Sequence, residues 1–339
     1  MTPSHARVSA IAGRFASLRA LVVGDVMLDE FTIGRVDRIS PESPVPVVAF
    51  TRAEHRLGGA ANVAHNLRAL GAAVDVVGVV GDDEAAATLR GALDRAGIGH
   101  ALATAGDRPT TRKVRVVTTR NQQVARVDYE SDRDISEPLT SQVVAEIGAR
   151  LGAASVVVVS DYAKGVVTAP VMQFLARETA ARQIPLLVDP KIPHLAIYTG
   201  ATLVTPNHHE AEAATGMRIR DVEDARAAAR ALRARVGCAS VLITWGEHGM
   251  WVLEGARAAE GTEATIVDET HLPAVAREVA DVTGAGDTVV ASVALALAAG
   301  ASLAEAATLA NHAAGIAVAH FGPTAVSFAD LLASFTSPG

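Results

Sequence analysis

Short runs of valine, leucine and isoleucine alternate with alanine-rich stretches along most of the chain. The runs carry few polar residues, as expected for strands of a mainly parallel sheet covered on both faces. The alternation predicts an α/β, three-layer, doubly wound fold that binds ligands at the carboxyl ends of its strands. Strands are expected at Leu21–Gly24, Val74–Val80, Val156–Ser160, Leu186–Asp189, Leu203–Thr205 and Val241–Thr244, and helices at Asp83–Ala96, Ala169–Arg182 and Val222–Val236.

Two segments, at about 31–57 and 110–130, do not follow this alternation. The first places three prolines beside a valine-rich run, and the second interleaves valines with arginine and lysine. Both patterns are typical of antiparallel or irregular β insertions outside a main sheet. We expect them to form a small β-sheet lid on a single domain that occupies residues 1–339, although ordinary solvated hairpins would give the same pattern.

Composition narrows the class of protein. Of the 339 residues, 50% are hydrophobic, which supplies a sizeable core, and the net charge of −7 argues against a non-specific nucleic-acid binder. A single cysteine, Cys238, excludes an intramolecular disulfide. The longest apolar helical candidate, Val289–Ala299, is shorter than the roughly 20 residues that span a bilayer, and no signal-peptide pattern occurs. A cytoplasmic protein without a membrane partner is expected.

The strongest local signal is Asp-Val-Thr-Gly-Ala-Gly-Asp-Thr at residues 281–288, directly before an apolar helical run. Small residues at Gly284, Ala285 and Gly286 let backbone N–H groups approach an anion, and the helix N-terminus adds partial positive charge. Asp287 would then stand beside a phosphoryl group, ready to accept a proton from an attacking hydroxyl. We expect the helix terminus to keep its pKa low. A glycine turn with an aspartate cap is the alternative.

Further polar groups follow predicted strands, where a doubly wound fold binds ligands. Asp25 and Asp29 follow the first strand, and Gly58-Gly59 with Asn62 open a helix. These residues could hold sugar hydroxyls, or they could simply cap their elements. Aspartate and lysine also follow two later strands, where they could bind a sugar phosphate or form surface ion pairs: Asp161 with Lys164, and Asp189 with Lys191.

The second half of the chain offers candidates for a nucleotide site. Asn207 and Glu210 have the spacing of a capping box, but Glu210 could instead support Mg²⁺ near phosphates. Thr244, Gly246 and Gly249 could form a nucleotide shelf or a hairpin turn. The chain contains neither the Gly-x4-Gly-Lys-Ser/Thr loop of P-loop NTPases nor a Gly-x-Gly-x2-Gly fingerprint after the first strand, which disfavours P-loop NTPases and nicotinamide oxidoreductases.

Together these motifs resemble those of the ribokinase-like PfkB family of sugar kinases, from about residue 20 to 330. Residues 281–288 are similar to the C-terminal signature of the family, and Gly58-Gly59 with Asn62 to its N-terminal signature. The resemblance is greatest to one branch, the D-glycero-β-D-manno-heptose-7-phosphate kinases of ADP-heptose and lipopolysaccharide core synthesis. The segments similar to that branch are Gly24–Asp29, Arg38–Val48, Leu57–Ala64, Thr111–Arg115, Arg120–Gln123, Arg126–Glu130, Ser160–Gly165 and Val188–Lys191.

The resemblance implies that ATP phosphorylates the anomeric hydroxyl of heptose 7-phosphate, with Asp287 as base and Gly284, Ala285 and Gly286 as anion hole. It implies Mg²⁺ at Glu210, and a monovalent cation in some relatives, to which Asp281 and Thr283 could contribute. The residues implied for the sugar phosphate are Asp25, Asp29, Gly58, Gly59, Asn62, Lys113, Arg115, Glu130, Asp161, Lys164, Asp189 and Lys191. Those implied for the nucleotide are Asn207, Thr244, Gly246, Gly249, Asn311 and Gly315.

The resemblance also bears on assembly and substrate. The lid commonly forms a homodimer interface in this family. Bifunctional relatives carry a C-terminal adenylyltransferase domain, and a chain ending at Gly339 has no room for it. A standalone kinase is therefore expected. After Lys191 the chain reads Ile-Pro-His-Leu, whereas the branch usually has glycine, and this departure concerns the sugar-phosphate contact. A PfkB kinase of another sugar and a non-catalytic sugar-binding regulator are the rival hypotheses.

Overall fold

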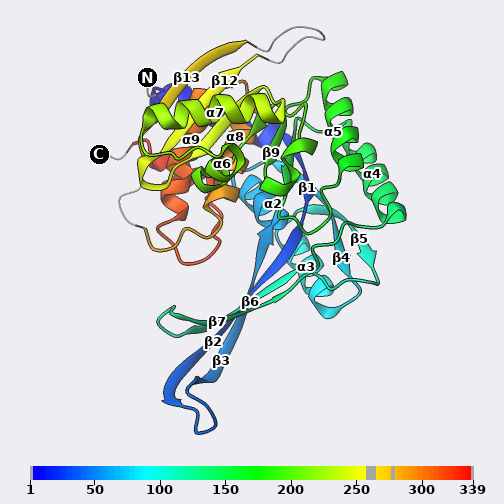
Figure 1. The fold of residues 1–339 in the computed structure, drawn as a ribbon, viewed down its shortest axis with the longest axis vertical. Coiled ribbons are helices and arrows are strands. Elements are labelled where there is room, and N and C mark those ends of the chain that lie inside the picture. The colour runs from blue at the N-terminus through cyan, green and yellow to red at the C-terminus, as the bar shows by residue number, and fades with distance from the viewer. Residues whose placement is uncertain (1–2, 257–264, 276–278, 337–339) are drawn as a thin grey trace.

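A large twisted sheet forms the centre of the molecule in a computed structural model, which describes residues 3–256, 265–275 and 279–336 (Figure 1). Within these residues the sheet has nine strands, and pairing is parallel except at the β11–β12–β13 edge. In spatial order the strands are β13 (Ile266–Leu272), β12 (Met250–Gly255), β11 (Ser240–Thr244), β10 (Leu203–Val204), β9 (Leu186–Asp189), β8 (Val156–Ser160), β1 (Arg19–Gly24), β4 (Ala73–Gly81) and β5 (Gly99–Ala105).

Helices cover both faces of this sheet, which gives the three-layer doubly wound α/β fold expected from the sequence. One face carries α1 (His5–Ala12), α2 (Ala60–Ala69), α3 (Glu84–Arg95), α8 (Ala285–Ala298), α9 (Leu303–Ala317) and α10 (Phe328–Ala333). The other carries α4 (Glu137–Leu151), α5 (Ala169–Arg182), α6 (His208–Thr215) and α7 (Val222–Val236). Short 3-10 turns occur at Phe15–Ser17, Ile192–Ile197 and Gly246–His248.

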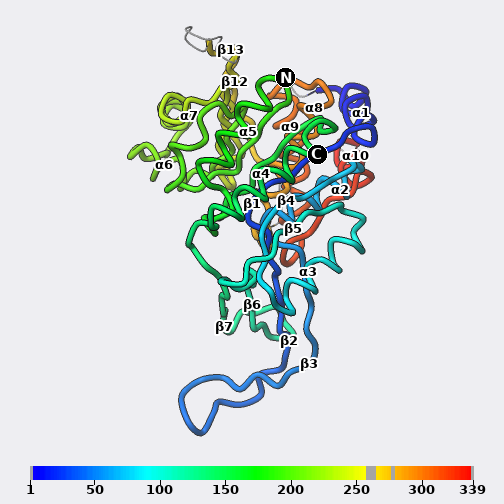
Figure 2. Tube along the Cα trace, turned by 90° about the vertical axis from the view of Figure 1, so that its right-hand side faces the viewer, coloured from blue at the N-terminus to red at the C-terminus, as the bar shows by residue number. Residues whose placement is uncertain are grey.

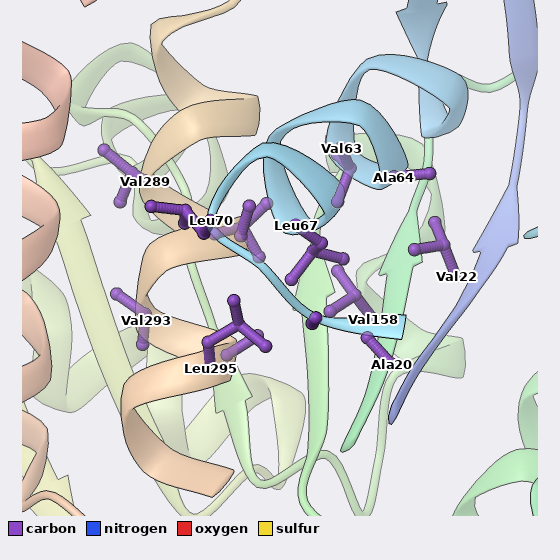
Figure 3. Packing of buried hydrophobic residues seen from close by; sticks show 14 of the residues in the cluster. Ala20, Val22, Val63, Ala64, Leu67, Leu70, Val158, Val289, Val293 and Leu295 are labelled. Carbon is purple, nitrogen blue, oxygen red and sulfur yellow. The ribbon is translucent and has the colours of Figure 1, made fainter. Parts of the chain in front are cut away.

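Alternate residues of each central strand enter opposite cores. Val22 and Val158 lie in the core beneath α2 and α8, whereas Val23 belongs to the core beneath the α4–α7 layer. Figure 3 shows Leu67 of α2 in the first core, among side chains from β1, β8 and α8. Burying a side chain of this size stabilises the fold by about 1.5–3 kcal/mol. Both sheet faces are therefore apolar, as the continuous valine runs indicate.

Helix α8 is the central helix of its layer. Its residues from Asp287 to Ala296 are buried nearly all round, and it packs against α2, α9, β8 and β9. A helix that is apolar on every side is fixed by its neighbours rather than by solvent. Its first turn, which carries Asp287, therefore has a defined position relative to the ends of the central strands. In the described part of the chain, every helix is too short or too polar to cross a bilayer.

A second sheet of four strands extends away from the body, and we call it the lid (Figures 1 and 2). Its order is β3 (Pro46–Gly59), β2 (Val26–Ile39), β6 (Arg112–Thr118) and β7 (Gln123–Tyr129). The β2–β3 hairpin forms the long projection and is antiparallel, whereas β2 and β6 pair in parallel. The first insertion begins near residue 26 rather than 31, because β2 follows β1 after a single residue, Asp25. The two predicted insertions thus form one sheet.

Candidate active site

The carboxyl ends of the parallel strands bring most of the predicted site residues together. Asp25 follows β1, Asp161 follows β8 and Asp189 ends β9, while the root of the lid supplies Asp29 and Gly58. Backbone pairing continues across this edge, since the amide of Asp25 donates to Ser160 and that of Asp161 donates to Asp189. The site therefore lies where the central sheet, the lid and the first turn of α8 meet.

Asp287 is held by two donors from different elements. Its side chain is 3% exposed; the amide of Asn62 donates to Oδ2 at 2.7 Å and the hydroxyl of Tyr162 donates to Oδ1 at 3.0 Å. Gly284 stands before the helix at φ 80°, where a Cβ atom would approach the amide nitrogen of Asn62 too closely. Around Gly286 the space on the Cβ side is open. The turn thus leaves room for an anion beside a fixed carboxylate.

The pKa of Asp287 differs from the expectation. Burial raises the pKa of this carboxyl to about 6, the negative charge of Asp29 adds to the rise, and the donors from Asn62 and Tyr162 together with Lys191 oppose it. The expected low pKa is wrong because loss of water outweighs the helix terminus and the two hydrogen bonds. A carboxylate with this pKa is ionised at neutral pH and is a stronger base than an exposed aspartate.

Tyr162 is a site residue that the sequence did not single out. Besides its bond to Asp287, its ring has the ammonium groups of Lys113 and Lys191 at 5.8 and 5.2 Å from its centroid. Burial and the nearby Asp287 raise the pKa of the phenol further, so it remains a donor. Its position in the Ser-Asp-Tyr-Ala-Lys-Gly segment was visible in the sequence, but the direction of its hydroxyl was not.

Asp25 braces the loop after β8. Its carboxylate accepts backbone hydrogen bonds from Tyr162 at 2.7 Å, Lys164 at 3.0 Å and Val166 at 3.1 Å. Burial and the charge of Asp161 raise the pKa of Asp25 to about 6 despite these donors. The protein already occupies the oxygens of Asp25, so this residue shapes the site more directly than it offers acceptors to a ligand.

Asp161, fully buried, is tied down in the same way. It accepts hydrogen bonds from the hydroxyl of Tyr198 at 2.6 Å and the backbone of Ala163 at 2.7 Å, and Nδ1 of His194 lies 2.7 Å away. His194 belongs to the segment that replaces the glycine usual after the lysine in the resembled branch. The replacement of this glycine therefore adds a contact between His194 and Asp161 beneath the site.

Asp29 and Arg115 form an ion pair at the root of the lid. Both side chains are largely buried, and the guanidinium of Arg115 also covers the ring of Phe31. A Cβ atom at Gly58 would overlap the carboxylate of Asp29, and one at Gly59, where φ is 54°, would overlap the carbonyl of Asp25. The two glycines are thus required by the close approach of the strand to both acidic residues.

The predicted phosphate-binding cations differ in availability. Lys164 contacts Glu130 at 2.9 Å and Asp132 at 2.6 Å, and Arg115 is paired with Asp29. In contrast, Lys113 is half-buried and has no carboxylate partner among the residues that the structure describes. Lys113 is therefore the cation most open to an added phosphate.

Glu210 has a structural role at the start of α6. Its Oε2 accepts from the backbone of Asn207, whose side chain accepts from the Glu210 amide, so the capping box is formed. The other oxygen, Oε1, accepts from Lys191 at 2.6 Å. Among the described residues, no group of three metal-ligating side chains is found. Glu210 alone therefore does not make a metal site.

Asp189 is a buried acidic residue of the site whose nearest opposite charge is that of Lys191. Its carboxylate lies beside Asp287, Asp161 and Glu210 but accepts no hydrogen bond within the described part of the chain. Burial, followed by the charge of Asp287, raises its pKa well above the ordinary range, although the ammonium group of Lys191 opposes the rise. The excess of negative charge favours a ligand that brings a cation or a hydroxyl donor to this position.

The predicted nucleotide residues lie along the β11–β12 side of the sheet. Thr244 pairs with Asn207, Gly246 is at φ 52°, and a Cβ atom at Gly249 would overlap the carbonyl of Leu272. Asn311 and Gly315 lie on α9, which packs against β12 and β13, and the Asn311 amide donates to the carbonyl of Pro273 at 2.7 Å. The structure thus joins Asn207 with Thr244, but no described contact joins either to α9 residues.

The turn before α8 is fixed by Asp281. Its Oδ1 accepts from the backbone and hydroxyl of Thr283 at 2.9 and 2.7 Å, and its Oδ2 accepts from the amide of Gly322 at 2.9 Å. These hydrogen bonds lower the pKa of Asp281 despite its partial burial. Both oxygens are engaged, so Asp281 links the 281–288 turn to the segment after α9.

The arrangement of sheet, helices and lid is that of known sugar kinases. The fold is similar to an Arabidopsis thaliana ribokinase complexed with ribose and ATP, with a TM-score of 0.70 and 20% identity over 95% of this chain and 99% of that one. It is also similar to Escherichia coli phosphofructokinase-2 in complex with potassium, with a TM-score of 0.73 and 19% identity over 94% of this chain and 97% of that one. The protein therefore has the ribokinase-like α/β fold.

Residues 18–329 match the pfkB family of carbohydrate kinases, and the chain belongs to that family. It is 45% identical to the bifunctional protein HldE of Citrifermentans bemidjiense over 94% of this chain and 64% of the relative. The HldE of Caulobacter vibrioides is 46% identical over 95% of this chain and 64% of the relative. The chain thus spans about two thirds of the length of these relatives. The chain is therefore a member of a family of carbohydrate kinases.

Proposed function

We propose that the protein transfers the γ-phosphoryl group of ATP to the anomeric hydroxyl of D-glycero-β-D-manno-heptose 7-phosphate, giving the 1,7-bisphosphate in the cytoplasm. The observation that supports phosphoryl transfer is the buried carboxylate of Asp287, oriented by Asn62 and Tyr162 beside the glycine turn of α8. The choice of sugar rests on the resemblance to the heptose-7-phosphate kinase branch and on the similarity to HldE proteins.

In this proposal Asp287 accepts the proton of the acceptor hydroxyl as its oxygen bonds to the γ-phosphorus. The bond between that phosphorus and the bridging oxygen breaks, and ADP leaves with the electron pair. The backbone N–H groups of Gly284 and Gly286 would stabilise the charge of the transferring group, whereas the predicted N–H of Ala285 donates to the carbonyl of Val282 at 3.2 Å. Because the proton leaves late in a loose transition state, orientation of the hydroxyl by the site matters more than base strength.

The acidic groups around Asp189 suit an indirectly held Mg²⁺. This ion commonly keeps several waters and binds through one or two carboxylates together with substrate phosphates, so a cluster of three protein ligands is not required. Asp189 offers a carboxylate that accepts no hydrogen bond within the described residues, and Glu210, which is paired with Lys191, adds its negative charge nearby. When bound, the ion would neutralise phosphate charge, and these two residues would hold it, Glu210 through water.

The 7-phosphate is assigned to the cationic side of Tyr162. Lys113, on β6 of the lid, is half-buried above the ring, and Lys191 lies within 5.2 Å of the same ring. Lys113 has no carboxylate to displace, whereas Lys191 must share its charge with Glu210. We therefore assign the main phosphate contact to Lys113, with a lid movement bringing it to the sugar.

The outer part of the lid is proposed as a homodimer interface. Apolar side chains are exposed on the β2–β3 hairpin, with Ile39 and Phe50 exposed by 60% and 67%. Val45, in the loop of the hairpin, adds to this set. A projecting sheet with several exposed apolar residues is typical of a protein–protein contact.

A panel of acceptors tests the proposed substrate. ADP release is measured with heptose 7-phosphate, ribose, fructose and fructose 6-phosphate, with Asp287→Asn as the inactive control. We expect the greatest kcat/KM with heptose 7-phosphate. A higher value with another sugar would reassign the substrate within the family, and sugar binding without ADP release from any acceptor would favour a non-catalytic regulator.

A further inference from the structure

A cavity of about 670 Å³ lies at the root of the lid, outside the group of acidic residues described above. Its walls come from β3, α2, the end of α3 and the segment 320–325. This volume is in the range of sites for small molecules. The site residue that it shares with the proposed phosphoryl-transfer centre is Asn62; Asp25, Asp29, Tyr162 and Asp287 do not line it.

The lining is basic although the chain as a whole is acidic. Two arginines and three histidines contribute to it, and within the described part of the chain no aspartate or glutamate does. The basic lining residues are His55, Arg56, His65, Arg95 and His320. Most of the remaining wall is apolar, from alanine, leucine, phenylalanine and proline side chains. A ligand with one anionic group and a less polar body would match this surface.

The two arginines are in different states. Arg56 donates to the carbonyl of Phe321 at 2.6 Å and lies 3.5 Å from Glu54, so part of its fork is engaged. Arg95, in the last turn of α3, is exposed and makes neither an ion pair nor a hydrogen bond through its side chain to any residue that the structure describes. A positive charge at a helix C-terminus is favourable because it interacts with the helix dipole. That effect accounts for Arg95 but not for the histidines that also line the cavity.

We propose that this cavity is a second ligand site, which binds a small molecule carrying a phosphate monoester or diphosphate, with Arg95 as the principal anion contact. A guanidinium fork matches the oxygens of a phosphate group and binds it through charge-assisted hydrogen bonds. Arg56 adds a second positive charge, and His65 and His320 provide imidazole nitrogens nearby. The apolar wall formed by Leu57 and its neighbours would receive the rest of the ligand.

The site is connected to the proposed base through short contacts. Asn62, which lines the cavity, donates to Asp287, and a Cβ atom at Gly284 would lie between Asn62 and Pro323, another lining residue. The amide of Gly322, between two lining residues, donates to Asp281. An occupant of the cavity would therefore contact Asn62 and Pro323, the two lining residues that lie next to Gly284.

The test is a calorimetric titration of the whole chain with pyrophosphate in saturating ADP, which fills the proposed nucleotide site. Arg95→Gln is compared with Arg68→Gln, an exposed arginine on neighbouring α2 that does not line the cavity. We expect a binding event in the wild type and in Arg68→Gln, and an affinity about tenfold weaker in Arg95→Gln, as for the loss of one charge-assisted hydrogen bond. Equal affinities in the three proteins, or no binding to the wild type, would overturn the proposal.

Further titrations distinguish the sources of the phosphate. AMP and glucose 6-phosphate represent nucleotide and sugar ligands, and the one that binds better with the same dependence on Arg95 identifies the class. Citrate represents carboxylate anions, and binding of citrate as tight as that of pyrophosphate would contradict the assignment to phosphate. Neither Arg95 nor Arg68 belongs to the proposed phosphoryl-transfer centre, and the readout is binding, so the result is independent of the sugar that the kinase uses.

Discussion

Replacing Asp287 by asparagine separates the role of this carboxylate in turnover from the effect of its burial on stability. Asparagine has the same shape as aspartate. Its side-chain oxygen can still accept from Asn62, and its NH₂ group can donate to the hydroxyl of Tyr162, which then acts as acceptor instead of donor. The substituted side chain cannot accept the proton of an attacking hydroxyl. We expect turnover in Asp287→Asn to fall by about 10²–10⁴-fold with ATP binding retained.

The same substitution should stabilise the fold at neutral pH. Burial raises the pKa of Asp287 from an ordinary 3.8 to about 6, so ionising it in the folded protein costs about 3 kcal/mol at roughly 1.4 kcal/mol per pKa unit. The pKa of Asp287 is higher in the folded state than in the unfolded state. The free-energy cost of ionising it is therefore absent below pH 4, where the carboxyl is neutral in both states, and complete above pH 6. The Tm of Asp287→Asn should therefore exceed that of the wild type by roughly 5 °C at pH 8 and equal it near pH 3.5.

Thermal unfolding at several pH values, with ADP release measured on the same preparations, checks both expectations. Asp25→Asn is the matched control, because the pKa of Asp25 is also raised to about 6 but its oxygens accept three backbone N–H groups. An amide cannot satisfy all three, so Asp25→Asn should lower the Tm. A Tm difference between wild type and Asp287→Asn that does not change with pH would refute the argument from burial, and wild-type turnover would refute the assignment of the base.

Three further substitutions test the surroundings of the base. Tyr162→Phe removes a donor that lowers the pKa of the base, so the acid limb of the kcat/KM profile, expected near pH 6 in the wild type, should move upward by roughly 0.5–1 pH unit. Gly58→Ala places a Cβ atom against Asp29 and should raise the KM for the sugar about tenfold or more, whereas Gly152→Ala, where the space is open, should not. Phe50→Glu puts a charge on the exposed lid, and light scattering should then report the mass of one chain; an unchanged dimer would exclude this surface.

Buried elements could be predicted closely from the sequence. Val156–Ser160 and Leu186–Asp189 are strands over the expected residues, and Ala169–Arg182 and Val222–Val236 are helices over theirs. Continuous aliphatic runs and alanine-rich amphipathic stretches are decided by local pattern, because both faces of the sheet are covered. The strand Gly99–Ala105 was not predicted, because it lies at the sheet edge and its small, half-exposed residues give no clear period.

The site residues could be placed at strand ends, but their partners could not be derived from the sequence. Capping at Asn207 and Glu210 depends on a spacing of three residues and is confirmed. The bond from Tyr162 to Asp287 joins positions far apart in the chain, and its direction depends on how α8 packs. The pKa of Asp287 was misjudged for the same reason, since the sequence shows the helix terminus but not the extent of burial.

The acidic residues of the site fall into two groups by how the protein already uses them. Asp25 and Asp161 are saturated by donors from the protein, and Glu210 is divided between a lysine and a helix cap. Burial raises the pKa of both Asp189 and Asp287, and the charge of Asp287 adds to the rise at Asp189. The braced carboxylates fix the loops, whereas Asp287 is oriented by two side chains and the carboxylate of Asp189 accepts no hydrogen bond from a described residue, so these two are the carboxylates that face a hydroxyl and a phosphate in the proposed reaction. Sequence motifs list both groups alike, and only the contacts made in the folded chain distinguish them.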